Sequence, residues 1–210
     1  MITELLSQAN IALFYAVNQI HPCDAYDKLM LAGTFFSDRS RFPFYLLLII
    51  FSGYISVLRH KKSTSEMQAA TLALWQNIVI VFVVAFMADA AFLTFAKHFF
   101  HHPRPFVALP LSSVRLIGMS LSEHDYYLSF PSGHASFATL VAMSIWPALG
   151  RIGKSFACLY VVWACWSRLA LGVHFPADVV AGAATSACIV IAVRLMVLKY
   201  LKLPLVIKKS

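Results

Sequence analysis

The sequence predicts an all-α fold, a polytopic bundle of membrane-spanning helices, and a single membrane-embedded domain over residues 1–210. Of the 210 residues, 60% are hydrophobic and only 12% are charged, which is far more apolar than an ordinary soluble domain. Several apolar runs reach the length that a helix needs to cross a bilayer, and basic residues stand at their ends. We expect about five to six transmembrane helices and an N-terminal interfacial helix.

Residues 1–41 contain two short apolar segments. Residues 5–20 fit an interfacial helix better than a membrane span, because polar side chains interrupt them: Ser7, Gln8, Asn10, Asn18 and Gln19. Residues 24–36 predict a second short helix, which ends at Gly33 or at the polar loop of residues 37–41. Whether either segment crosses the membrane stays open at this point.

Longer apolar segments follow, and each predicts a membrane span. The first covers about residues 42–58 and the second about residues 69–96. The second contains Asp89, which must face protein or water, and we interpret it as a structural acid rather than a catalytic one. The remaining spans cover about residues 134–149, 153–172 and 178–198. Small residues over 181–187 in the last span predict tight helix packing.

The charges separate the two sides of the predicted bundle. The formal net charge is +8, and the basic residues gather at segment ends around residues 59–62, 151–154 and 199–209. By the positive-inside rule these ends are cytoplasmic. Since no basic patch is interleaved with aromatic residues, we expect no nucleic-acid partner. The long loop of residues 97–133 then lies on the opposite, outer side. Three polar clusters meet on that side, with the residues Lys97, Arg104, His134, Arg168, His174 and Asp178.

The first cluster lies at the start of the outer loop. Lys97 ends a predicted helix, and Arg104 stands between two prolines. Arg offers a rigid fork of donors that matches phosphate, and Lys offers a point charge, although both residues would also serve as interfacial anchors. The nearby histidines recur at helical spacing without a carboxylate to complete a metal site, so we expect them to tune the loop or touch headgroups: His98, His101 and His102.

The second cluster is the sequence Pro131-Ser132-Gly133-His134 at the start of a predicted helix. A helix start presents N–H groups without intrahelical partners and the positive end of its dipole, and both favour an anion. Gly133 lets a ligand approach the backbone closely, and His134 could protonate a leaving oxygen. The alternative is an ordinary helix cap with an interfacial histidine.

The third cluster runs from Ser167 to Asp178. Arg168 near the outer end of a membrane helix needs a partner, and His174 follows a helix stop at Gly172. Asp178 could accept a hydrogen bond from His174 Nδ1–H and leave Nε2 as a nucleophile. The alternative is a buried charge pair between Arg168 and Asp178.

Together the three patterns, Lys-x6-Arg-Pro, Pro-Ser-Gly-His and Ser-Arg-x5-His-x3-Asp, resemble the type-2 phosphatidic acid phosphatase superfamily over residues 97–178. The resemblance implies a metal-independent phosphatase without a cofactor, which acts through a phosphohistidine intermediate. His174 would be the nucleophile, Asp178 would orient it, and His134 would be the acid for the leaving group. The phosphoryl group would be bound by Lys97, Arg104, Ser132, Gly133 and Arg168.

The apolar composition favours the membrane lipid phosphatases of this superfamily over its soluble members. The substrate would then be a phospholipid or an isoprenyl diphosphate, with undecaprenyl diphosphate as our first expectation. Phosphatidylglycerophosphate, phosphatidic acid and lipid A stay open, as does transfer of the phosphoryl group to another lipid. We expect a bacterial inner-membrane protein with its site on the outer, periplasmic side. The oligomeric state is not readable from the sequence, because small-residue stripes pack helices within one chain as readily as between chains.

Overall fold

The computed structural model describes residues 2–20, 23–61, 63–118 and 123–201, and within these ranges it contains helices and no β-strand. The α-helices are α1 (Ile2–Asn18), α2 (Asp24–Phe36), α3 (Phe42–Arg59), α4 (Ser65–Phe100), α5 (Pro105–Ala108), α6 (Gly133–Ile145), α7 (Arg151–Ala170) and α8 (Pro176–Leu201). Short 3₁₀ helices lie between them, namely η1 (Arg39–Arg41), η2 (Leu111–Ser113), η3 (Glu123–Tyr127) and η4 (Trp146–Ala148).

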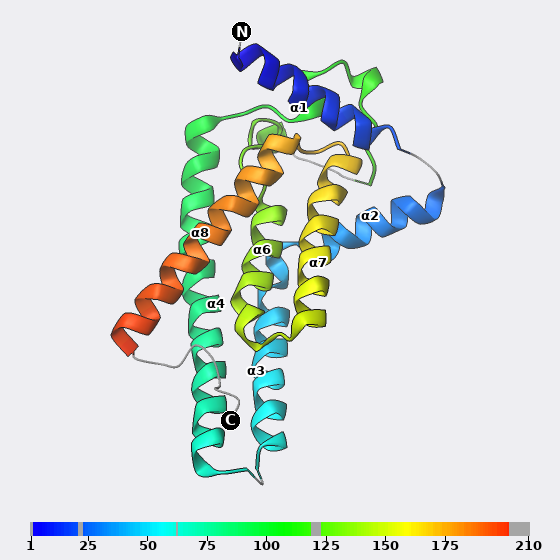
Figure 1. Ribbon diagram of the computed structural model, residues 1–210. Coiled ribbons are helices and arrows are strands. Elements are labelled where there is room, and N and C mark those ends of the chain that lie inside the picture. The colour runs from blue at the N-terminus through cyan, green and yellow to red at the C-terminus, as the bar shows by residue number, and fades with distance from the viewer. Residues whose placement is uncertain (1, 21–22, 62, 119–122, 202–210) are drawn as a thin grey trace.

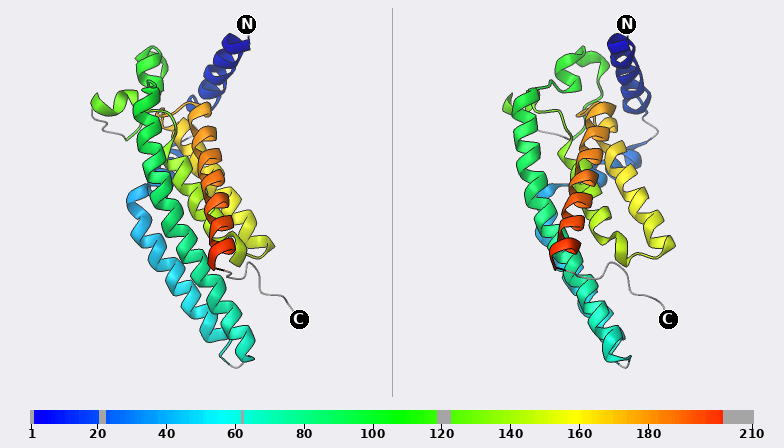
Figure 2. Two further views of the ribbon diagram at one scale, coloured as in Figure 1. Left: turned by 90° about the vertical axis from the view of Figure 1, so that its left-hand side faces the viewer. Right: turned by 60° about the vertical axis from the view of Figure 1, so that its left-hand side comes forward.

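The helices α3, α4, α6, α7 and α8 run side by side as a bundle, whereas α1 and α2 lie across it (Figures 1 and 2). Helix α6 is the central element and packs against α4, α7 and α8. The hairpin of α3 and α4 projects beyond the other helices at the end of the bundle away from α1 (Figure 1). The connection in this hairpin carries the basic residues near Arg59, and α7 begins toward the same end with Arg151.

Within the described residues, three segments are long and apolar enough to cross a membrane: residues 39–59, 65–108 and 176–200. They contain the predicted spans 42–58, 69–96 and 178–198. Helix α7 corresponds to the predicted span 153–172, and α6 with η4 corresponds to 134–149. The 13 residues of α6 extend about 20 Å, and the surrounding helices bury most of them. The predicted all-α membrane helix bundle is therefore confirmed.

The core between α4, α6 and α8 is built from large apolar side chains. Ile78 and Phe82 of α4, Phe137 and Leu140 of α6, and Val190 of α8 are all fully buried. Because lipid tails are as apolar as these side chains, close van der Waals packing holds such helices together rather than exclusion of water. The central helix α6 is thus fixed along its length, and this packing fixes the position of its first residues.

Polar residues of α1 bind the ends of two bundle helices. Asn18 Nδ2 donates hydrogen bonds to the carbonyl oxygens of Leu169 and Ala170, at 3.2 and 3.1 Å, at the end of α7. Asn10 Oδ1 accepts a hydrogen bond of 2.9 Å from the N–H of Ala177 at the start of α8. Helix ends leave such groups without intrahelical partners. The polar residues that make α1 a poor span therefore cap the two helices that flank the α7–α8 turn.

Helix α8 approaches the start of α6 closely at Gly182. A Cβ atom on this residue would lie 2.3 Å from the carbonyl oxygen of Ser132, a distance that side chains do not tolerate. The small residues of α8 therefore allow the tight packing that the sequence predicts.

Replacing Gly182 with alanine should destabilise the protein. Helix propensity alone favours alanine by about 1 kcal/mol, but the clash with the Ser132 backbone should reverse the sign and cost about 1–3 kcal/mol net. Thermal unfolding of the purified protein in detergent measures the change. Gly150→Ala is the matched control, because no atom lies within 4 Å of the added methyl group there. A Gly182→Ala variant as stable as Gly150→Ala would contradict this packing.

Candidate active site

A pocket of about 400 Å³ lies where α4 ends and α6 and α8 begin. Charged and polar side chains dominate its lining, which consists of Asp38, Arg39, Lys97, Arg104, Asp125, Gly133, His134, Arg168 and His174. The structure thus brings six of the predicted site residues to one cavity. The other two, Ser132 and Asp178, are buried behind this lining and joined by a hydrogen bond of 2.9 Å from the Ser132 N–H to the Asp178 carbonyl oxygen.

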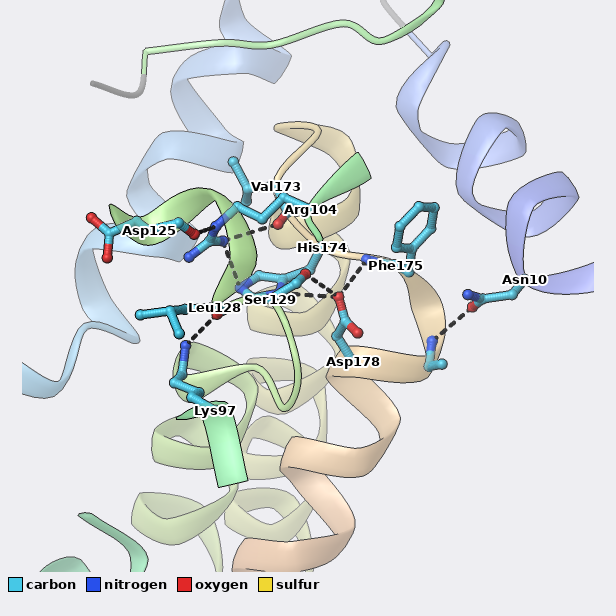
Figure 3. Close-up of polar contacts among 11 residues, drawn as sticks. Asn10, Lys97, Arg104, Asp125, Leu128, Ser129, Val173, His174, Phe175 and Asp178 are labelled. Carbon is cyan, nitrogen blue, oxygen red and sulfur yellow. Dashed lines mark hydrogen bonds and ion pairs between the residues drawn. The ribbon is translucent and has the colours of Figure 1, made fainter. Parts of the chain in front are cut away.

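His174 and Asp178 form a buried pair in the turn before α8 and in its first turn (Figure 3). Asp178 Oδ2 lies 3.3 Å from His174 Nδ1 and also accepts hydrogen bonds from Ser129 Oγ at 2.5 Å and from the Phe175 N–H at 2.9 Å. This network places the imidazole proton on Nδ1 and leaves a lone pair on Nε2. The geometry therefore favours the orienting role of Asp178 over its pairing with Arg168.

Gly172 directs His174 into the pocket. It has a φ of +78°, in the left-handed region that favours glycine, and a Cβ atom would lie 2.4 Å from the carbonyl oxygen of Arg115. The turn closes with a hydrogen bond from the Val173 N–H to the Arg168 carbonyl oxygen. The helix stop at Gly172 that the sequence predicts is thus confirmed, and it is what reverses the chain ahead of His174.

Arg104 connects the outer loop with the α7–α8 turn. Its Nε donates to the carbonyl oxygen of Asp125 at 2.8 Å, and its Nη1 donates to the carbonyl oxygen of Val173 at 3.0 Å (Figure 3). The same Nη1 lies 3.3 Å from His174 Nε2. Arg104 as a whole is only 6% exposed, so the loop backbone holds a rigid positive charge directly beside the imidazole lone pair.

Two further cations face the same space. Lys97, near the end of α4, donates a hydrogen bond of 2.7 Å to the carbonyl oxygen of Leu128. Arg168, in the last turn of α7, is almost fully buried, and its Nη1 donates to Thr34 Oγ1 of α2 at 2.7 Å. The acceptors in these bonds are neutral, so they position the cations without cancelling their charge. The pocket is therefore suited to an anion with several oxygen atoms.

The electrostatic surroundings keep His174 neutral. Burial, followed by the positive charges of Arg104, Arg168 and Lys97, holds the pKa of His174 well below its usual value of 6.5. His174 lies in the turn between α7 and α8, where its ring is 2% exposed. A neutral imidazole with an unprotonated Nε2 is the form required of a nucleophile.

The start of α6 forms another side of the pocket. Ser132 occupies the N-cap position, and its buried Oγ has no hydrogen-bond partner among the residues that the structure describes. At Gly133 a Cβ atom would meet only Arg39 Cδ, at the ordinary contact distance of 3.7 Å. The protein itself thus leaves room at this glycine. His134 follows on the first turn, with its Nε2 buried.

Comparison with known proteins agrees with this geometry. Residues 78–202, which are more than half of the chain, match the PAP2 superfamily. The chain belongs to the PAP2 superfamily. The resemblance that the three motifs predict is thus confirmed.

Individual relatives of this PAP2 protein cover different shares of it. A candidate undecaprenyl-diphosphatase of Escherichia coli (strain K12), YbjG, is 34% identical over 121 residues, which are 54% of this chain and 57% of YbjG. The structure of Aquifex aeolicus LpxE has a TM-score of 0.68 at 25% identity and covers 91% of this chain and 96% of that chain. A transmembrane PAP2-type phosphatidylglycerolphosphate phosphatase from Bacillus subtilis shares the fold, with a TM-score of 0.67, 21% identity and coverage of 93% and 88%.

Two pocket residues of this PAP2 protein lie outside the matched region and were not among the predicted site residues. Asp38 and Arg39, at the start of η1, both line the cavity. In the sequence they stand in a polar loop that we interpreted only as a helix stop. Ser129, which binds Asp178, was missed as well. No motif or spacing marks these residues, and their roles depend on how η1 and the outer loop fold over α6.

An ion pair between a partly exposed arginine and a buried aspartate connects η1 with the bundle. Asp89 of α4 is fully buried, and its Oδ1 accepts a hydrogen bond of 2.6 Å from Ser136 Oγ of α6. Its Oδ2 lies 3.6 Å from Arg39 Nη2, and the Arg39 guanidinium also lies 5.4 Å from the ring centre of Phe86. Asp89 therefore faces protein, as the sequence predicts, and it anchors the segment that carries Asp38.

The histidines of the outer loop pack against aromatic residues or backbone. His101 stacks on Tyr127 with 5.1 Å between ring centres, and the His102 ring lies 6.3 Å from that of Phe175. His98 Nδ1 donates to the carbonyl oxygen of Thr94. Whether these histidines tune the outer loop or touch headgroups stays a prediction. Among the neighbouring polar residues 123–125, Asp125 lines the pocket, whereas the side chain of His124 lies outside the described part of the structure.

Replacing Asp89 with asparagine should destabilise the protein by about 1–3 kcal/mol, because Arg39 loses its negatively charged partner in a largely buried place. Asparagine keeps the shape and can still accept the Ser136 hydrogen bond. Thermal unfolding in detergent measures the change. Asp24→Asn, in the first turn of α2 at an exposed position, is the control. Equal stability of the two variants would show that the ion pair does not anchor η1.

Proposed function

We propose that this PAP2 protein is an integral membrane lipid phosphatase that hydrolyses a phosphomonoester or diphosphate headgroup through a phosphohistidine intermediate. The observation that carries the proposal is the arrangement around His174. Its Nδ1 faces Asp178 at 3.3 Å, and its Nε2 faces Arg104 in a pocket lined by further cations. A neutral nucleophile thus stands where positive charge would hold a phosphoryl group.

In the first step, His174 Nε2 attacks phosphorus and the bond to the leaving oxygen breaks. His134 donates a proton to that oxygen, so the lipid leaves protonated, as an alcohol from a phosphomonoester or as a monophosphate from a diphosphate. Asp178 stabilises the positive charge that develops on the His174 ring. Lys97, Arg104 and Arg168 stabilise the charge on the equatorial phosphoryl oxygens in the transition state.

In the second step, water attacks phosphorus and the bond to His174 Nε2 breaks. His134, now neutral, accepts a proton from the attacking water. Inorganic phosphate is released, and both histidines return to their starting states. The residues of this chain supply the nucleophile, the acid and base, and the positive charge, so we propose a reaction that requires no metal or other cofactor.

The start of α6 supports the binding of the phosphoryl group. The first N–H groups of a helix lack intrahelical acceptors, and the helix dipole adds positive potential there. The buried Ser132 Oγ is a further donor, and the space at Gly133 lets an oxygen atom approach the backbone. We assign to these two residues a share in phosphate binding.

As substrate we propose undecaprenyl diphosphate, in a bacterial inner membrane with the site on the periplasmic side. The sequence relationship to a candidate undecaprenyl-diphosphatase and the several cations of the pocket support this choice. Phosphate release from purified protein in detergent, measured with undecaprenyl diphosphate, phosphatidylglycerophosphate, phosphatidic acid and lipid A, tests it. The highest kcat/KM should be found with undecaprenyl diphosphate, and preference for another of these lipids would overturn the choice of substrate.

Replacing His174 with alanine should lower kcat by roughly 10³-fold or more, because no other group can form the covalent bond to phosphorus. The same phosphate-release assay measures the loss, and the melting temperature in detergent reports whether the variant is folded. His98→Ala, on the exposed side of α4, should keep nearly normal turnover. Near-normal turnover of a folded His174→Ala variant would contradict the proposal that His174 is the nucleophile.

Replacing Asp178 with asparagine should lower kcat by about 10²–10⁴-fold with a smaller change in KM, because the imidazole loses the carboxylate that fixes its tautomer and stabilises its charge. Steady-state phosphate release by Asp178→Asn and by the unmodified protein gives the kcat and KM values to compare. If KM rose and kcat stayed constant, Asp178 would serve binding rather than the orientation of His174.

A further inference from the structure

The η1 segment brings a carboxylate to the mouth of the cationic pocket. Asp38 is the N-cap of η1, and its Oδ1 accepts a hydrogen bond of 2.7 Å from the Ser40 N–H. Its other oxygen, Oδ2, lies 3.4 Å from His134 Nε2. The ion pair of Arg39 with Asp89 holds the same segment from the next residue along the chain. The hydrogen bond from Ser40 and the ion pair of the neighbouring Arg39 therefore both restrict the position of the Asp38 carboxylate.

The surroundings of His134 are otherwise rich in positive charge. Arg168 from α7, Lys97 from α4, Arg104 before α5 and Arg39 from η1 share the pocket with it, and His174 lies across from it. Positive neighbours disfavour the imidazolium form that a proton donor needs, and a carboxylate at ion-pair distance favours it.

The other acidic groups near the site have different partners. Asp178 binds His174 and Ser129, and Asp89 binds Ser136 and Arg39 behind the pocket. Asp125 lines the pocket beside Arg104. The carbonyl oxygen of Asp125 accepts a hydrogen bond from Arg104 Nε. Asp38 is the acidic group that the structure places against the His134 ring.

We propose that Asp38 is a positioning residue for His134, which holds the imidazole beside the pocket and supplies negative charge that offsets part of the effect of burial and of the neighbouring cations on its protonated form. The inference rests on the acid role proposed above for His134. The site then contains two histidine–carboxylate pairs with opposite tasks. Asp178 faces Nδ1 of a neutral imidazole whose Nε2 attacks phosphorus. Asp38 lies 3.4 Å from Nε2 of His134 without hydrogen-bond geometry, so its charge favours the imidazolium while the Nε2 proton can still go to the leaving oxygen.

The proton balance of the reaction leaves Asp38 ionised throughout. The proton moves from His134 Nε2 to the leaving oxygen as the phosphorus–nitrogen bond to His174 forms, and His134 regains a proton from water as that bond breaks. The ion-pair contact with His134, followed by the hydrogen bonds with Ser40, holds the pKa of Asp38 well below its usual range even though burial opposes this. Asp38 therefore acts through its charge and position, not as a proton carrier.

The test uses two substrates that share the phosphoryl group and differ in the leaving group. Dioctanoyl phosphatidic acid releases a poorly stabilised alkoxide and needs a proton donor, whereas p-nitrophenyl phosphate releases a stable phenolate and does not. In Asp38→Asn, kcat for dioctanoyl phosphatidic acid should fall by about 10–100-fold, while kcat for p-nitrophenyl phosphate stays close to that of the unmodified protein. Asp38→Glu should recover part of the loss.

The pH dependence provides a second readout. Without the carboxylate, His134 loses its proton more easily, so the alkaline limb of kcat for dioctanoyl phosphatidic acid should move to lower pH in Asp38→Asn. Asp38→Ser, which can also accept the Ser40 hydrogen bond, repeats the measurement if the asparagine variant folds poorly. The control Asp24→Asn should leave both substrates and the pH profile unchanged.

Equal losses on both substrates, or no loss on either, would overturn the role of Asp38. His134→Ala, measured in parallel, separates this failure from a failure of the proposed mechanism. If His134→Ala loses activity on dioctanoyl phosphatidic acid only and Asp38→Asn does not, the acid role of His134 stands and the inference about Asp38 falls. If His134→Ala slows the release of both leaving groups equally in the first turnover, before the base role of His134 in the second step comes into play, the acid role itself is wrong.

Discussion

The structure depends on holding positive charge in a buried place without neutralising it. Arg104 is bound by the carbonyl oxygens of Asp125 and Val173, and Lys97 is bound by that of Leu128. These neutral acceptors satisfy the hydrogen bonds of the cations, yet the charge itself still favours an anion. Because the acceptors belong to the outer loop and to the α7–α8 turn, both segments must keep a defined backbone course for the pocket to exist.

Several features outside the pocket maintain that backbone course. Gly172 permits the sharp reversal that delivers His174, and Gly182 lets α8 approach the start of α6. The short helix α1 lies across the end of the bundle (Figure 1), where Asn18 and Asn10 bind the end of α7 and the start of α8. The polar residues of an apparently marginal helix therefore keep the α7–α8 turn in place. The contacts that fix the geometry of the pocket are therefore made at helix ends, and not in the apolar core.

The sequence predicts the helices, the spans and the convergence of the motif residues, because apolar runs, basic loops and motif spacing are all local patterns. His134 and His174 start or precede helices on the same predicted side, so their approach follows from topology. The approach of Asp38 to His134 does not follow from any pattern. It requires the ion pair between Arg39 and Asp89, which joins a short loop to the middle of a distant helix. Side-chain contacts between distant segments are what the sequence leaves open.

The central claim is that a covalent bond forms between phosphorus and His174. Rapid mixing of the purified protein with a lipid substrate radiolabelled at the transferred phosphate, quenching in alkali and mapping of the labelled peptide tests it directly. The account predicts a transient label that is stable in alkali and lost in acid, carried by His174, and absent from His174→Ala. Turnover without any labelled protein, or a label on another residue, would contradict it.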